Sequence, residues 1–381
     1  MSEPDLQDIV GQDEAIARLQ RYMRGGRAPH AMLFEGPDGV GRRTTAVALA
    51  KGLLCHSPRG VERSPSAGQP AHGAFIANCG RCDDCRMMAA GTHPDFHPIY
   101  KELARYHDDP DVRGRVMQEL GIEVIRSFLI APAGLTSARG KGKVFVVLEA
   151  ELMSGAAQNA LLKTLEEPPS DVTIILVCQR LDSLLPTTLS RCAAVRFGPL
   201  PRQFVKDRLM ETGVDQEQAE FWTSFTDGSL GRAIELAGRD MYPVKCKLVD
   251  KLAEGGGGLG EQFSETADKL AAAEVSQTKK SQGADLSKTL ASRRAAGLML
   301  ELIAGAYRDA LVLVTGCGSL AANADQAPAV EAIAGRFSAG TLAGIIESLS
   351  RYEQLLWRNV SPRLVWDNVA LTCASGQGPD L

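Results

Sequence analysis

The stretch His30–Leu54 reads HAMLFEGPDGVGRRTTAVALAKGLL. It begins with a short apolar run, continues through the glycine-rich turn GPDGVG and ends in a segment rich in Ala and Leu. These three parts predict a buried strand, a tight turn and a helix. A phosphate-binding loop has the same order, because its glycines allow backbone N–H groups to face a phosphate.

The turn departs from a working phosphate-binding loop, which reads G-x-x-x-x-G-K-[ST], with a lysine for the phosphates and a hydroxyl for Mg²⁺. The glycines are kept, as Gly36, Gly39 and Gly41. Arg42 replaces the lysine and Arg43 replaces the hydroxyl, while Thr44 comes one position too late. A guanidinium is a poor substitute for an ammonium in a tight anion site, and it cannot bind a cation.

The second half of a magnesium site is also missing. In such ATPases an apolar strand ends in Asp-Glu, where the aspartate orients Mg²⁺ and the glutamate commonly polarises water. The matching place reads Val146-Val147-Leu148-Glu149, so leucine replaces the aspartate. We therefore predict that the chain does not hydrolyse ATP. Passive binding of ATP or ADP is doubtful, and the turn kept only for the fold is an equal alternative.

Apolar runs and helical segments alternate through the first half of the chain. Lys143–Ala150 and Val172–Cys178 are short and β-branched, as strands buried on both faces of a parallel sheet are. The segment Ala156–Glu167 between them is helical and stops at two prolines. This alternation predicts an α/β layer with helices on both faces.

Beyond Pro199 the strand pattern ends and the segments have helical spacing. The clearest amphipathic helices are Ala295–Val314 and Ala339–Leu356, whereas the polar stretch Ser276–Lys288 is interpreted as an excursion from the helical part. Gly228 and the glycine run 255–258 are the expected breaks.

Composition restricts the function only broadly. The 381 residues are enough for two or three domains, and a net charge of -4 gives no general attraction to nucleic acid. The chain has no basic segment followed by an apolar run at its N-terminus, and no apolar stretch of about 18 residues. We therefore expect a cytoplasmic location and no membrane partner.

Three of the nine cysteines form the pattern Cys79-Gly-Arg-Cys82-Asp-Asp-Cys85, and Cys55 completes a set of four. Four thiolates at this spacing can surround a tetrahedral Zn²⁺ and leave no position open for chemistry. We predict a structural zinc. His56 or His72 is an alternative fourth ligand, and an iron–sulfur cluster uses similar ligands.

Several stretches together resemble the bacterial clamp-loader branch of the AAA+ ATPases. They are, in chain order, IVGQ (Ile9–Gln12), HAMLFEGP, the cysteine knuckle followed by GTHPD (Gly91–Asp95), NALLKTLEEPP (Asn159–Pro169), LPTTLSRC (Leu185–Cys192) and RNVSPRL (Arg358–Leu364). The long insertion between Cys55 and Cys79 and the segment 103–121 depart from the family pattern.

The resemblance implies an AAA+ type P-loop parallel sheet domain with a zinc knuckle, a small helical lid domain and a C-terminal helical collar domain. The implied bounds are 1–199 with the knuckle at about 55–85, 200–243 for the lid and 244–381 for the collar. It further implies a component of the DNA polymerase III holoenzyme, a DNA-directed DNA polymerase. The implied partners are gamma/tau-like ATPase subunits, a delta-like clamp-opening subunit, a sliding clamp and primed DNA.

The resemblance also gives Arg191 a role. In this family the arginine of the Ser-Arg-Cys motif projects into the ATP site of the neighbouring subunit, so Arg191 is expected to be an arginine finger in trans. The alternative is a salt bridge at the end of a strand. Arg232, in a motif similar to one that senses nucleotide, is expected to be structural here.

Two other functions remain open from the residues. One is an active ATPase that uses Arg42 and Thr44 in shifted roles with Glu149 as the base. The other is a zinc-bearing adaptor in a different DNA-processing assembly. ATP hydrolysis by the purified chain would favour the first, and failure to co-purify with a gamma/tau-like ATPase would favour the second.

Overall fold

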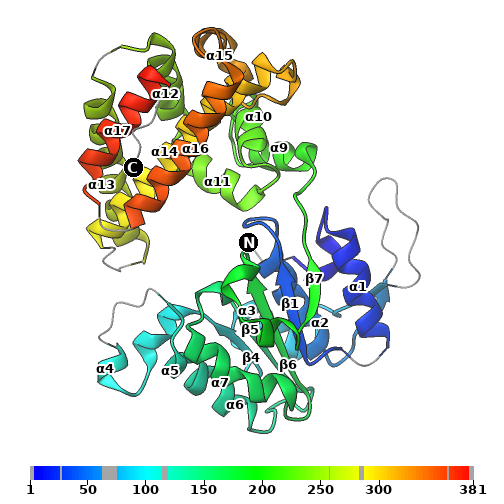
Figure 1. Cartoon of the computed structure of the whole chain (residues 1–381). Coiled ribbons are helices and arrows are strands. Elements are labelled where there is room, and N and C mark those ends of the chain that lie inside the picture. Colours follow the sequence, from blue (N-terminus) through cyan, green and yellow to red (C-terminus); the bar gives the residue numbers. More distant parts are fainter. Residues whose placement is uncertain are drawn as a thin grey trace. The chain divides into compact units, whose positions relative to one another are not determined.

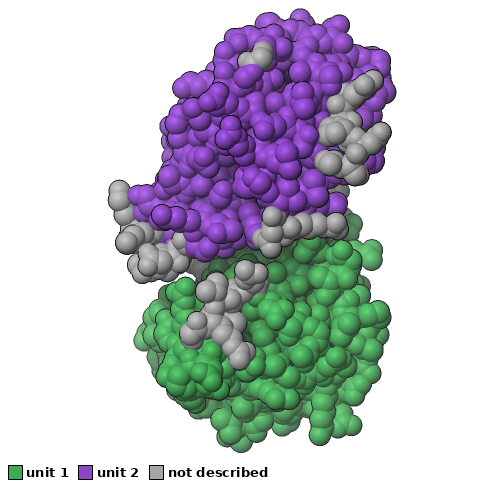
Figure 2. Space-filling model, turned by 60° about the vertical axis from the view of Figure 1, so that its left-hand side comes forward, with its two compact units in different colours: residues 1–205, 228–232 green, residues 206–227, 233–381 purple. Residues whose placement is uncertain are grey.

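The computed structural model describes residues 4–25, 28–61, 75–113, 119–256, 258–282, 287–357 and 360–376. The chain divides into two compact units, which Figure 2 colours separately. The first unit holds residues 1–205 and 228–232, and the second holds residues 206–227 and 233–381. The division into an N-terminal, a lid and a collar domain stays a prediction, since the second unit contains residues of both helical domains.

The first unit is built on a parallel sheet of five strands in the order β4-β5-β6-β1-β7 (Figure 1). The strands are β1 (Ala31–Glu35), β4 (Phe96–Ile99), β5 (Lys143–Val147), β6 (Val172–Cys178) and β7 (Ala193–Arg196). In β1, Ala31 lies opposite Ile174 of β6 and Met32 lies opposite Ala193 of β7. Every residue of β1 and β5 is buried, as expected for central strands covered on both faces.

The helices of this unit cover the two faces of the sheet. They are α1 (Asp13–Arg24), α2 (Arg42–Leu54), α3 (Asp83–Ala90), α4 (Pro110–Arg113), α5 (Ile122–Ile125), α6 (Ala131–Ala133), α7 (Gly155–Glu166) and α8 (Pro186–Leu189). A π-helical turn, Arg126–Ile130, joins α5 to α6. Residues of α5 to α7 form one core with Phe145 and Ile174, and α2 contacts the same strands from the other face. The predicted doubly covered α/β layer is confirmed.

Four short strands escaped the sequence analysis. β4 and β7 are four residues long and form the two edges of the sheet. β4 contains Pro98, which has no N–H to donate and is therefore tolerated at an edge. The other two, β2 (Arg59–Val61) and β3 (Phe75–Ala77), pair as an antiparallel ribbon. Segments of three or four residues are too short to show a periodic pattern, so pairing with adjacent strands determines their conformation.

Helices follow the sheet from residue 202 onward. They are α9 (Arg202–Glu211), α10 (Gln216–Phe225), α11 (Leu230–Gly238), α12 (Tyr242–Glu254), α13 (Leu259–Gln282), α14 (Lys288–Val314), α15 (Ala327–Ala334), α16 (Ala339–Trp357) and α17 (Pro362–Ser375). The predicted helical C-terminal region is confirmed. Part of the motif RNVSPRL lies outside the described residues.

One prediction about this region was wrong. Ser276–Gln282 is the last part of α13 and not an excursion, while residues 283–286 lie outside the described part of the chain. α13 packs against α14 and α17, and the buried Glu274 pairs with Arg294 of α14 at 3.2 Å. A polar composition is compatible with a helix here because tertiary packing overrides local propensity.

A buried lysine joins α10 to α12 within the second unit. The Lys245 side chain is 1% exposed and forms an ion pair with Asp325. Its ammonium also lies 4.0 Å from the ring centroid of Phe221 on α10. A charge removed from water in this way needs its partners, so the contact favours keeping the two helices together.

In the described part of the chain, no single helix is long and apolar enough to span a membrane. By length and composition alone, the pair Ala324–Ala334 and Ala339–Leu356 passes that test together, with a bend of 110° between its members.

Candidate functional site

The turn between β1 and α2 has the backbone of a phosphate-binding loop. Gly36, Gly39 and Gly41 have φ values of 149°, 70° and 99°. A Cβ atom on Gly36 would lie 2.3 Å from the carbonyl oxygen of Phe197, so only glycine fits at this position. α2 begins directly after Gly41, and the first N–H groups of a helix have no partner within it. The predicted strand, turn and helix are therefore present.

Residues 228–232 pack against this turn within the same compact unit. The N–H of Gly231 donates to the carbonyl of Gly39 at 2.9 Å. A Cβ on Gly39 would lie 2.3 Å from Ser229 Oγ, and one on Gly231 would lie 2.8 Å from Gly39 Cα. Arg232, in the motif that resembles a nucleotide sensor, comes directly after Gly231, whose backbone contacts the loop. The sequence alone did not reveal this contact.

The two arginines of the loop have different surroundings. The Arg42 side chain is 7% exposed, and its Nη2 lies 3.2 Å from Asp38 Oδ1. Arg43 is exposed, and Thr44 is partly buried. The hydroxyl of the next residue, Thr45, donates to the carbonyl of Gly41 at 2.8 Å, so it is engaged within the helix.

Both arginines face the end of β5 across one pocket. This pocket has a volume of about 450 Å³, and Arg42, Arg43, Leu148 and Glu149 are among the residues that line it. The structure thus brings together the two places where the sequence lacks a magnesium ligand. Neither a guanidinium nor a leucine side chain can bind a cation.

Carboxylates that the sequence analysis did not single out also line this pocket. They are Asp38, Glu102 and Glu151. Glu149 adopts a left-handed backbone conformation with φ 52°, and its Oε2 lies 3.7 Å from Lys101 Nζ. Asp38 lies in the glycine-rich turn and Glu151 lies two residues after Glu149, whereas Glu102 comes from a separate segment that the fold brings to the same pocket.

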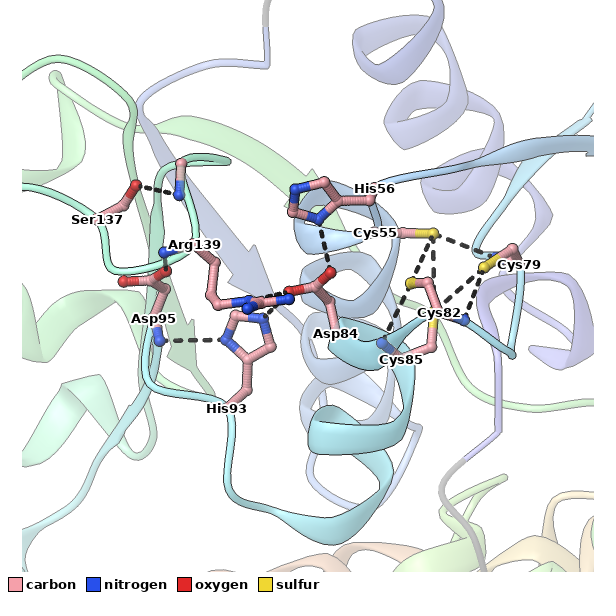
Figure 3. A network of polar contacts seen from close by, with 11 residues as sticks. Cys55, His56, Cys79, Cys82, Asp84, Cys85, His93, Asp95, Ser137 and Arg139 are labelled. Carbon is pink, nitrogen blue, oxygen red and sulfur yellow. Dashed lines mark hydrogen bonds and ion pairs between the residues drawn. The ribbon is translucent and has the colours of Figure 1, made fainter.

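Four cysteines meet at the end of α2 and the start of α3 (Figure 3). The sulfur atoms of Cys55, Cys79, Cys82 and Cys85 all lie within 4.8 Å of one another. The Sγ–Sγ distance is 3.7 Å for Cys55 and Cys85, and 3.9 Å for Cys55 and Cys82. A tetrahedral zinc with Zn–S bonds of about 2.3 Å places its sulfurs about 3.8 Å apart. The four thiols therefore fit one zinc ion.

Backbone N–H groups also point at these sulfurs. The N–H of Cys79 donates to Cys55 Sγ and that of Cys82 donates to Cys79 Sγ, both at 3.3 Å. Hydrogen bonds from the backbone of Arg81 and Cys82 lower the pKa of Cys79 to about 6, whereas burial raises the pKa of Cys85 to about 12. A bound cation would favour the thiolate form of all four groups.

The sequence left three alternatives to a zinc site of four cysteines: His56 or His72 as the fourth ligand, and an iron–sulfur cluster. His56 Nδ1 lies 2.6 Å from Asp84 Oδ2, so this histidine is engaged outside the cysteine cluster. His72 lies outside the described residues. An iron–sulfur cluster also contains inorganic sulfide and several irons, for which four sulfurs so close together leave less room than for a single ion.

A buried carboxylate, Asp84, lies next to the cysteine cluster (Figure 3). It is 2% exposed and accepts a hydrogen bond from Arg139 Nε at 3.0 Å. His93 Nε2 lies 3.3 Å from the same oxygen, Oδ1, that accepts from Arg139. Burial tends to raise the pKa of Asp84, but hydrogen bonds from Arg139 and His56 outweigh it and lower the pKa to about 2. The residue is therefore a carboxylate in the folded chain.

The GTHPD stretch connects this network to the loop before β5. Asp95 is buried, and its two oxygens accept the N–H groups of Ala138 and Arg139 at 2.8 Å each. Its own N–H donates to His93 Nδ1 at 3.1 Å, which leaves the proton of that ring on the nitrogen facing Asp84. The stretch was recognised only by resemblance, and the structure gives its side chains a role in joining the knuckle to the sheet.

Arg191 lies in the turn between α8 and β7. Its Nε lies 2.7 Å from Glu166 Oε1, and its Nη2 contacts the same oxygen. Nη1 donates to the carbonyl of Thr187 at 2.8 Å. The side chain is 32% exposed. The salt bridge that the sequence left as an alternative is thus present, and the role in a neighbouring ATP site stays a prediction.

Comparisons with known proteins place the chain in a family. The sequence model described as DNA polymerase III, delta subunit, matches residues 11–201. A second model, DNA polymerase III, delta subunit, C terminal, matches residues 266–372.

Three relatives have similar sequences. The chain is 30% identical to DNA polymerase III subunit delta' of Escherichia coli (strain K12) over 251 residues, 66% of this chain and 64% of the relative. It is 34% identical to subunit delta' of Pseudomonas aeruginosa over 231 residues, 59% of this chain and 62% of the relative. It is 33% identical to subunit tau of Escherichia coli (strain K12) over 202 residues, 53% of this chain and 27% of the relative.

The matches to the delta' relatives thus span less than two thirds of their length. The match of the first sequence model covers half of the chain and includes the whole parallel sheet. The chain therefore belongs to the DNA polymerase III, delta subunit family of clamp-loader proteins.

Proposed function

We propose that the chain is a non-hydrolysing, delta'-like subunit of the DNA polymerase III clamp loader, which helps to load the sliding clamp onto primed DNA in the cytoplasm. The observation that carries the proposal is that Arg43 and Leu148 line one pocket. A magnesium–ATP site has a hydroxyl and an aspartate at these two positions. The pocket therefore lacks the hydroxyl and the aspartate that hold the metal at these two positions during phosphoryl transfer.

A second part of the proposal concerns the neighbouring subunit. Arg191 would contribute its guanidinium to the ATP site of a gamma/tau-like ATPase, where charge develops on the transferred phosphoryl group. Its partly exposed position in a surface turn supports this role. A delta-like clamp-opening subunit would complete the assembly, and the work of this chain would be positional and electrostatic.

The proposed cofactor is one structural zinc ion, held by Cys55, Cys79, Cys82 and Cys85. The ion would hold the end of α2 against the start of α3. All four ligands come from the protein, so the metal would have no open position for a substrate.

The test is a measurement of ATP hydrolysis by the purified chain with Mg²⁺, alone and with primed DNA. We expect no turnover by the isolated chain. A rate of about 1 s⁻¹ or more, the low end of ordinary enzyme turnover, would overturn the proposal.

The alternative is an active gamma/tau-like ATPase. Glu149 lines the same pocket as Arg42, and tau subunits are among the relatives, which keeps this function open to test. The same measurement separates the two functions, because the alternative requires hydrolysis without any other subunit.

A further inference from the structure

We infer that Glu166 is a positioning residue for Arg191: it holds the guanidinium in the orientation in which it meets a phosphate of the neighbouring subunit. The inference rests on the proposed function, which places Arg191 in that ATP site. Among the described residues, Arg191 is the ion-pair partner of Glu166, and this inference gives that pair a function.

The contacts fix the plane of the guanidinium. Nε and Nη2 both meet Glu166 Oε1, so the carboxylate lies along one edge of the group. Nη1 donates to the carbonyl of Thr187 at 2.8 Å and to Ser190 Oγ at 3.3 Å. The outer N–H of Nη2 has no acceptor in the described part of the chain. It is therefore the donor that a phosphate oxygen can take without breaking the pair with Glu166.

Glu166 is well placed to act as a fixed support. It is the last residue of α7, and its neighbour Leu165 is 1% exposed in the core beneath the sheet. Arg191, by contrast, is a long side chain on a surface turn, and such a side chain samples many rotamers when it has no partner. The ion pair to the end of α7 restricts the guanidinium to one orientation. A catalytic group that is already oriented raises the reaction rate, because less conformational freedom is lost in the transition state.

The ion pair between Arg191 and Glu166 contributes little to the stability of the fold. Both side chains are partly exposed, at 32% for Arg191 and 46% for Glu166, and exposed pairs contribute little to the stability of a fold. Removal of Glu166 should therefore leave the chain folded. An effect on the neighbouring ATPase would then report the orientation of Arg191 and not a loss of structure.

The experiment uses the reconstituted clamp loader with Glu166→Ala, Glu166→Gln or Glu167→Ala in this chain. We expect Glu166→Ala to lower kcat of DNA-stimulated ATP hydrolysis about tenfold while KM for ATP and assembly of the loader stay unchanged. Glu166→Gln should retain part of the rate, because its amide oxygen still accepts a hydrogen bond. Glu167→Ala, an exposed neighbour, should have no effect.

Arg191→Ala separates the inference from the proposed function. If Arg191→Ala lowers the rate and Glu166→Ala leaves it unchanged or raises it, the inference is overturned and the finger assignment stands. If Arg191→Ala has no effect, the finger assignment fails first. A double variant no slower than Arg191→Ala alone supports the inference, because the two residues then act through one interaction.

Discussion

Gly231 donates its N–H to the carbonyl of Gly39 at 2.9 Å, and the two backbones approach so closely that neither residue has room for a side chain. Residues 228–232 thereby belong to the unit that carries the phosphate-binding turn. This close backbone contact fixes the segment 228–232 against the turn.

Gly231→Ala should destabilise the first unit. The added Cβ would lie 2.8 Å from Gly39 Cα, so one backbone must shift, and overpacking of this kind costs about 1–3 kcal/mol. Thermal unfolding of the purified variant measures the effect. Gly344→Ala is the matched control: it lies exposed within α16 with open space around it, and should stabilise its helix by up to about 1 kcal/mol. Equal stability of Gly231→Ala and the unaltered chain would contradict the contact.

Arg191→Ala should leave the chain folded and slow hydrolysis at the neighbouring site of the reconstituted loader by at least about a hundredfold, since arginine fingers supply that much or more. Arg191→Lys should recover little, because an ammonium lacks the fork of donors. The measurement is DNA-stimulated ATPase activity at saturating ATP. An unchanged rate in both variants would remove Arg191 from the proposed mechanism.

Metal analysis should find about one zinc ion per chain in protein purified without chelator. Cys82→Ser should lose most of this metal and lower the melting temperature, because a structural ion stabilises the fold that binds it. Cys317→Ser is the control, as this exposed cysteine lies outside the cluster. Metal-free wild-type protein, or unchanged zinc in Cys82→Ser, would refute the assignment.

Lys245→Ala should destabilise the second unit by about 3–5 kcal/mol, because it leaves Asp325, whose side chain is only 7% exposed, without its counter-charge. Denaturant unfolding measures this loss. The double variant Lys245→Met with Asp325→Asn should be more stable than Lys245→Ala, since it removes both charges together. A double variant as unstable as Lys245→Ala would mean that packing around Phe221, and not charge, sets the energy.

Much of the fold follows from local pattern. β6 has the predicted bounds, and the predicted helix at Ala156–Glu167 differs from α7 by one residue at each end. These segments are long enough for periodicity and stop signals to act. The edge strands β4 and β7 are too short for this, and α13 continues through polar residues while it packs against α14 and α17.

The sequence by itself determined the strand, turn and helix of the phosphate-binding loop, the loss of its lysine and hydroxyl, and three of the four cysteines, since each depends on residues close together in the chain. Only the tertiary structure decided between Cys55, which the sequence predicted as the fourth ligand, and the histidine alternatives, and only it showed that Gly231 packs on Gly39 and that Glu166 pairs with Arg191. The residues of each set are far apart in the sequence, and the folding of the sheet and its helices brings them together. Local sequence patterns do not specify which residues far apart in the chain come into contact, because such contacts depend on how the whole domain folds.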